Sequence, residues 1–134
     1  MSEFDGIEHI NLTVRDVVKT AAWYSDVLGL PITWEENSPE KGWHKIGLYH
    51  AGTGTRFNFT QHFSRPGDVF SEFRTGLDHL AFKVTGGRAG LETWVARLDD
   101  RGIPHSPIKQ AMNGDVVTIR DPDNIQVEIY ALPE

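Results

Sequence analysis

The sequence predicts an α+β fold made of two tandem βαβββ modules, and two observations carry that prediction. The stretch GIEHINLTV at residues 6–14 returns as the similar GLDHLAFKV at residues 76–84, with a histidine at the same place in each. After each stretch come a helical pattern, a glycine followed by a proline, and three further strand-like segments. The order of elements is therefore duplicated, although few residues are identical.

The first copy starts with a predicted strand at residues 7–14. Asp16 then offers a helix N-cap, AAWYSDVLG has apolar residues at helical spacing, and Gly29 with Pro31 ends that helix. Three strand candidates follow in the order PITWEE, HKIGLYH and TRFNFTQHF, separated by the turn-forming stretches SPEKGW and AGTGT.

The second copy repeats this order from a predicted strand at residues 77–84. The helix AGLETWVARLDD ends at Gly102 and Pro104, and strand candidates lie near PHSPIKQ, DVVTIRD and NIQVEIYAL. We therefore expect a first module at residues 1–63, a linker at 64–76 and a second module at 77–134, forming one structural domain.

Alternation of side chains across each strand separates an apolar face from a polar face. The polar faces carry His9, His79, Glu128 and Tyr130, together with Asn58 and His62. His9 and His79 are 70 residues apart (79 − 9), as are Asn58 and Glu128 (128 − 58). If the two sheets face each other, these polar faces line a shared central cavity.

Bulk composition narrows the class of protein. A formal net charge of −6 argues against nucleic acid as a partner, since phosphate binding favours a basic surface. The chain has no cysteine, no apolar run long enough to cross a membrane, and no signal-peptide pattern at its start. We expect a soluble, cytoplasmic protein that does not interact with membranes.

Three stretches resemble the vicinal oxygen chelate superfamily, also called the glyoxalase/bleomycin resistance/dioxygenase superfamily. They are IEHINLTVRDVVKTAAWYSDVLGLPI, GLDHLAFKV and VVTIRDPDNIQVEIY, and together they span nearly the whole chain. The resemblance implies paired βαβββ modules whose mixed sheets curl into an open barrel around a divalent metal ion.

Family ligands come from the first and fourth strands of each module, so the resemblance implies His9, His79 and Glu128 as metal ligands. The fourth position falls on Asn58, where related enzymes usually carry glutamate or glutamine. An asparagine carbonyl is a weak ligand, so three protein ligands with open positions fit this chain better. Whether Asn58 or His62 completes the site stays open at this point.

A ligand set of two imidazoles and one carboxylate suits Fe, Mn, Ni, Co or Zn and leaves positions free for two substrate oxygens. The implied substrate is a small molecule with vicinal oxygens, on which the metal stabilises an enediolate-like or oxyanion state. We expect His62 to act as the base and Tyr130 to donate a hydrogen bond to a bound oxygen. Lyase, isomerase, epoxide-opening and ring-cleaving dioxygenase reactions all remain compatible with these residues.

A second possibility is a non-catalytic protein that sequesters a small molecule, as antibiotic-binding members of the bleomycin resistance type do. The net charge of −6 would suit a cationic drug, whereas the three metal ligands favour the enzyme. We also expect a homodimer, in which the site could form within one chain or between two chains.

Overall fold

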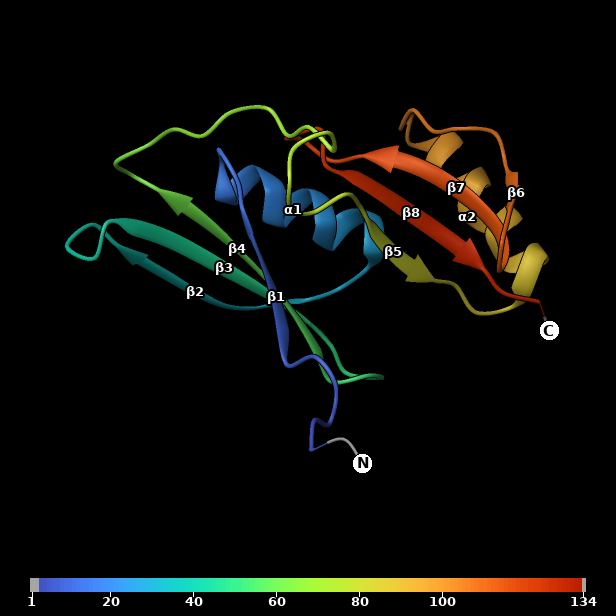
Figure 1. Ribbon diagram of the computed structural model, residues 1–134, viewed down its shortest axis with the longest axis horizontal. Coiled ribbons are helices and arrows are strands. Elements are labelled where there is room, and N and C mark those ends of the chain that lie inside the picture. Colours follow the sequence, from blue (N-terminus) through green and yellow to red (C-terminus); the bar gives the residue numbers. More distant parts are fainter. Residues whose placement is uncertain (1–2, 134) are drawn as a thin grey trace. The chain divides into compact units, whose positions relative to one another are not determined.

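The computed structural model describes residues 3–133, which form two compact units, one up to Val69 and one from Phe70 onward. Each unit holds one helix and one four-stranded mixed sheet in the order predicted for a βαβββ module (Figure 1). The predicted α+β fold of two such modules is therefore confirmed. Within residues 3–133, no helix combines the length and apolar character that crossing a membrane requires.

The first unit is built on a sheet with the strand order β1-β4-β3-β2, here called sheet A. Its elements are β1 (His9–Thr13), α1 (Val17–Leu28), β2 (Ile32–Ser38), β3 (Trp43–His50) and β4 (Thr55–His62). Strand β1 runs parallel to β4, and the other neighbours are antiparallel. The parallel pair follows from the crossover through α1 and the two intervening strands.

Helix α1 forms where the sequence analysis expected it, because both of its ends carry capping residues. The side chain of Asp16 accepts a hydrogen bond from the backbone N–H of Lys19, and Gly29 takes the left-handed conformation (φ 69°) that ends the helix. The helix packs on β3 and β4, where the ring of Tyr24 stacks on Phe59 with centroids 4.8 Å apart. Sheet A thus has one face covered by α1.

The second unit repeats this plan with a sheet of order β5-β8-β7-β6, here called sheet B. Its elements are β5 (Leu80–Lys83), α2 (Gly87–Asp100), β6 (Lys109–Ala111), β7 (Gly114–Arg120) and β8 (Gln126–Ala131). Helix α2 packs on β7 and β8 and buries Leu91 and Leu98. The apolar core of this unit lies between that helix and the buried side chains of Val117 and Val127.

The first and fourth strands pair in the same register in both modules. Asn11 on β1 pairs with Asn58 on β4, and Ala81 on β5 pairs with Glu128 on β8. The paired residues are 47 positions apart in both units (58 − 11 and 128 − 81). The repeat seen in the sequence is therefore also a repeat of β-sheet register.

The two repeated histidines lie at the starts of their strands rather than inside them. His9 is the first residue of β1, and His79 directly precedes β5, which begins at Leu80. Both strands start later than expected, because pairing with the fourth strand of each module begins only at His9 in β1 and at Leu80 in β5. Both imidazoles are therefore close to a sheet edge and partly exposed.

Candidate functional site

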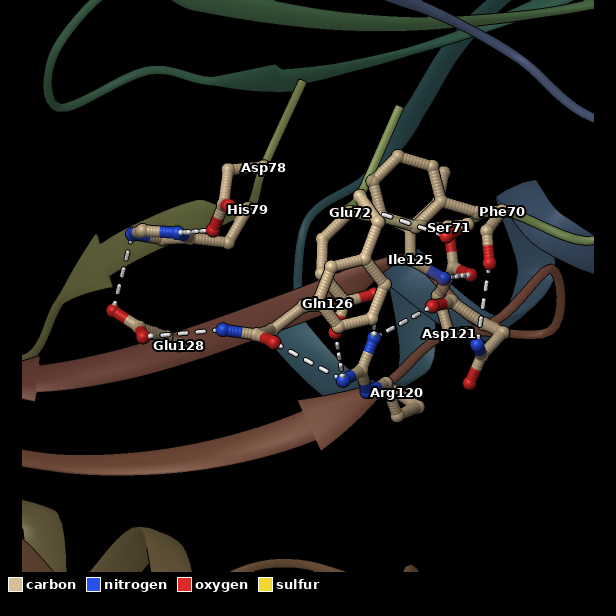
Figure 2. Close-up of polar contacts among 12 residues, drawn as sticks. Phe70, Ser71, Glu72, Asp78, His79, Arg120, Asp121, Ile125, Gln126 and Glu128 are labelled. Carbon is tan, nitrogen blue, oxygen red and sulfur yellow. Dashed lines mark hydrogen bonds and ion pairs between the residues drawn. The ribbon is translucent and has the colours of Figure 1, made fainter. Parts of the chain in front are cut away.

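Sheet B brings His79 and Glu128 together on its polar face. The Nε2 atom of His79 lies 3.4 Å from Oε2 of Glu128, and the two side chains are 38% and 17% exposed (Figure 2). Glu128 reaches this position because β8 is a central strand, with Ala81 and Thr118 as its cross-strand neighbours. This pair is the centre of the candidate site.

A second carboxylate sets the state of the His79 ring. Nδ1 of His79 lies 2.7 Å from Oδ1 of Asp78, and an ionised carboxylate can only accept a hydrogen bond. Nδ1 therefore carries a proton, and in the neutral imidazole Nε2 presents its lone pair to Glu128. Two acceptors facing each other repel, and a cation bound by both groups would turn this repulsion into attraction.

The other oxygen of Glu128 belongs to a row of polar contacts along sheet B. Gln126 Nε2 donates to Glu128 Oε1 at 3.4 Å, and Arg120 donates to Gln126 Oε1 at 3.1 Å (Figure 2). Arg120 also makes two hydrogen bonds to the carboxylate of Glu72, at 2.9 and 3.3 Å. The Arg120 hydrogen bonds lower the pKa of Glu72 below its ordinary value, and Glu72 raises the pKa of Arg120 in turn.

Sheet A carries a related arrangement around His9. The carboxylate of Glu8 contacts Nδ1 of His9 and forms an ion pair with Arg56 Nε at 3.2 Å. The hydrogen bond from His9 is the main cause of the lowered pKa of the Glu8 carboxyl. Each repeated histidine thus has the acidic residue directly before it as the partner of its Nδ1 atom.

Asn58, the fourth position suggested by the resemblance, is enclosed rather than open. Its Oδ1 atom is buried and has no hydrogen-bond partner in the described part of the chain. Gly47 lies opposite it on β3, and a Cβ at Gly47 would come within 2.8 Å of that oxygen and 2.2 Å of the Trp34 Nε1 atom. The indole of Trp34 and the amide of Asn58 therefore share the space that the missing Gly47 side chain leaves.

The two residues predicted as catalytic lie on the polar faces of different sheets. His62 is the last residue of β4, exposed, with the parity of Asn58. Tyr130 is half-buried on β8, with the parity of Glu128. Tyr130 is therefore in the same unit as the His79–Glu128 pair, and His62 is in the unit of His9.

Residues 6–129 match the Glyoxalase/Bleomycin resistance protein/Dioxygenase superfamily. The chain belongs to this superfamily.

Similar proteins match most of the length of this chain. The uncharacterized protein YraH of Bacillus subtilis (strain 168) is 31% identical over 133 residues, covering 92% of this chain and 95% of that protein. The crystal structure of a glyoxylase/bleomycin resistance protein/dioxygenase domain from Frankia sp. EAN1pec is 27% identical, with a TM-score of 0.85, covering 98% of this chain and 100% of that one.

The fold also matches a fosfomycin resistance protein at lower identity. A mutant of FosX, the genomically encoded fosfomycin resistance protein of Listeria monocytogenes, was solved with Mn(II) and 1S,2S-dihydroxypropylphosphonic acid. It is 18% identical, with a TM-score of 0.73, and the match covers 97% of this chain and 94% of that one. At this identity the likeness shows the fold alone.

In this superfamily member, residues 3–133 contain no group of three His, Asp or Glu side chains close enough to hold a metal ion. The structure unites His79 with Glu128, while His9 lies in the first unit with its own carboxylate partner. Asp78, Glu8, Gln126 and Glu72 were not among the site residues predicted from the sequence. The acidic residue before each repeated histidine was the signal that could have revealed the first two.

Proposed function

We propose that this protein is a divalent-metal-dependent enzyme acting on a small substrate with vicinal oxygens, and that His9, His79 and Glu128 bind the metal. The observation that supports it is the approach of His79 Nε2 and Glu128 Oε2, two atoms of metal-ligating types, which face each other at 3.4 Å. A divalent cation between them would replace their repulsion by two coordinate bonds.

The donor set fits a first-row transition metal. Two imidazole nitrogens and one carboxylate oxygen leave coordination positions open for substrate oxygens, as in facial-triad sites. Asn58 fits poorly as a fourth ligand, because its amide oxygen is neutral and enclosed beside Trp34. Mn(II) is a reasonable first probe, since the structural relative FosX was crystallised with it.

The chemistry we propose combines charge stabilisation with proton transfer. When bound, the metal would act as a Lewis acid that stabilises negative charge developing on the substrate's adjacent oxygens. His62 would take a proton from the substrate, because an imidazole has an ordinary pKa near neutrality. The Tyr130 hydroxyl would donate a hydrogen bond to a substrate oxygen and hold it in place.

Titration calorimetry with Mn(II) tests the ligand assignment. We expect one site in the wild-type protein and a loss of binding of at least tenfold in His9→Ala, His79→Ala and Glu128→Gln. His50→Ala is the matched control, since His50 is an exposed histidine whose side chain forms a hydrogen bond with Thr53. If His79→Ala binds Mn(II) as tightly as the wild type, His79 and Glu128 do not bind the metal as a pair.

Reaction class can be separated by two assays on the metal-loaded protein. A ring-cleaving dioxygenase would consume oxygen with Fe(II) and a catechol, whereas a lyase or isomerase would exchange a substrate proton with solvent without oxygen uptake. His62→Gln should abolish proton exchange while leaving Mn(II) affinity unchanged. Loss of Mn(II) affinity in that variant would instead make His62 a ligand.

A non-catalytic binding protein of the bleomycin resistance type is the second candidate, and the net charge of −6 favours it for a cationic ligand. Tight binding of bleomycin to metal-free protein, unchanged in His79→Ala, would support it over the enzyme. We also propose a homodimer. Light scattering would test the assembly, and anomalous scattering from crystals grown with Mn(II) would show which chains supply the ligands.

A further inference from the structure

We propose that Gln126 and Arg120 are positioning residues for Glu128, and that Glu72 makes the metal affinity of the site depend on the docking of residues 70–72 onto sheet B. The inference rests on the proposed function, because it concerns the same metal site. It goes further by linking that site to the segment that joins the two modules.

Arginine fixes which way the Gln126 amide points. A guanidinium has only N–H donors, so the Gln126 atom that lies 3.1 Å from Arg120 Nη2 must be the carbonyl oxygen. The amide nitrogen is then directed at Glu128 Oε1, 3.4 Å away. Without Arg120, the amide could rotate and present its oxygen to the carboxylate, which would repel it.

Because the Gln126 amide is fixed, the two carboxylate oxygens of Glu128 have different partners. Oε1 is held by the Gln126 N–H, and Oε2 is left facing His79 Nε2. A hydrogen bond on one oxygen restricts rotation of the carboxylate about its last bond, so less conformational entropy is lost when Oε2 binds a cation. The hydrogen bond from Gln126 therefore leaves Glu128 able to bind a cation through Oε2 alone.

Arg120 is itself held by the segment before β5. Its guanidinium makes two hydrogen bonds to Glu72, and its Nη1 atom also donates to the backbone oxygen of Asn124. The Phe70 N–H donates to the backbone oxygen of Asp123 at 2.9 Å, and the Asn124 side chain donates to the Phe70 oxygen at 3.3 Å. These bonds attach residues 70–72 to the turn between β7 and β8.

The row of contacts from Glu72 to His79 is continuous within this unit, as Figure 2 shows. If residues 70–72 lift from the turn, Arg120 loses its carboxylate partner, and its hydrogen bond to the Asn124 oxygen then holds the guanidinium beside Gln126 less firmly. The metal ligand Glu128 would then lose its oriented donor. Docking of this segment and metal binding should therefore favour each other.

Calorimetry of the full chain with Mn(II) tests this coupling. Gln126→Met keeps the length of the side chain and removes both hydrogen bonds, and we expect about tenfold weaker Mn(II) binding. Glu72→Gln removes the charge that holds Arg120 and should weaken binding in the same direction by a smaller factor. Glu92→Gln is the matched control, since Glu92 pairs with Arg88 on α2 in the same unit, and its affinity should equal that of the wild type.

A metal-free readout separates this inference from the proposed function. In a crystal structure of Gln126→Met without metal, the Glu128 carboxylate should rotate away from its 3.4 Å contact with His79. If Glu128 stays in place and Mn(II) affinity is unchanged, the positioning role is wrong even though the metal site stands. If the wild type binds no Mn(II) but Glu128 rotates in the variant, the proposed function fails and the positioning role stands.

Discussion

Asp78 accepts a hydrogen bond from Nδ1 of His79 at 2.7 Å, and the corresponding contact joins Glu8 to His9 in the other module. In both modules the histidine is preceded by an acidic residue whose carboxylate contacts the Nδ1 atom of the ring. Carboxylates in this position orient metal-binding imidazoles and increase their basicity.

Asp78→Ala is therefore expected to weaken Mn(II) binding by about 10- to 100-fold. In the metal-free wild type, nitrogen chemical shifts of the ring should show the His79 proton on Nδ1, and the variant should populate the other tautomer. Asp100→Ala, an exposed acid at the end of α2, is the control and should bind like the wild type. A wild-type His79 ring without a proton on Nδ1 would contradict the assignment.

The fold was predictable from the sequence because its signals are local. Asp16 and Gly29 mark the ends of α1 through hydrogen bonding and backbone conformation that depend on neighbouring residues alone. The alternation of side chains along each strand is equally local, and it predicted that Asn58 and Glu128 lie on the polar faces of their strands. The strand pairing then places Asn58 opposite Asn11 and Glu128 opposite Ala81. Repetition of the pattern supplied the number of modules.

The contacts around Glu128 were not predictable in the same way. Arg120 meets Gln126 because β7 and β8 pair in one particular register, and a shift of one residue would put them on opposite faces. Glu72 lies 48 positions before Arg120 in a segment without regular structure, so no periodic pattern in the sequence predicts their contact. The burial of the Asn58 oxygen likewise depends on the Trp34 ring, which occupies the space that a side chain at Gly47 would fill.

Gly47→Ala should displace the Trp34 indole. The added Cβ would lie 2.2 Å from Trp34 Nε1 and 2.8 Å from Asn58 Oδ1, both closer than atoms can approach. We expect a loss of about 1–3 kcal/mol of unfolding free energy, typical of overpacking, measured by urea denaturation. The Trp34 indole resonance should move in the nitrogen–proton NMR spectrum.

The matched control for Gly47 is Gly52→Ala, whose Cβ would meet only the ring of His50, at 3.1 Å. The exposed His50 side chain can move aside, so stability should stay close to that of the wild type. If Gly47→Ala leaves the Trp34 resonance unmoved, the indole does not occupy the space above Gly47.

Asp16→Ala should destabilise the first unit by about 1 kcal/mol, because it removes the side-chain acceptor for the Lys19 backbone N–H. Asp16→Ser retains an acceptor and should recover most of that loss. Urea denaturation of both variants measures the difference. Equal stability of Asp16→Ala and wild type would show that the N-cap contact seen at 3.0 Å contributes nothing to the native state.

His105 should make stability depend on pH. Its Nδ1 lies 2.7 Å from the backbone oxygen of Ser106 and its Nε2 lies 2.7 Å from Oδ1 of Asp99, so the charged ring can donate to both. The Ser106 hydrogen bond, followed by the one to Asp99, raises the pKa of His105 above its ordinary value.

A raised folded-state pKa means that protonated His105 favours the folded chain. Its contribution is complete below the unfolded-state pKa of about 6.5 and is lost as pH rises through the folded-state pKa. His105→Gln should therefore lower the unfolding free energy more at pH 5.5 than at pH 8.5, as measured by urea denaturation. Asp99→Asn should remove part of this pH effect, and an equal loss at both pH values in His105→Gln would contradict the role of the charged ring.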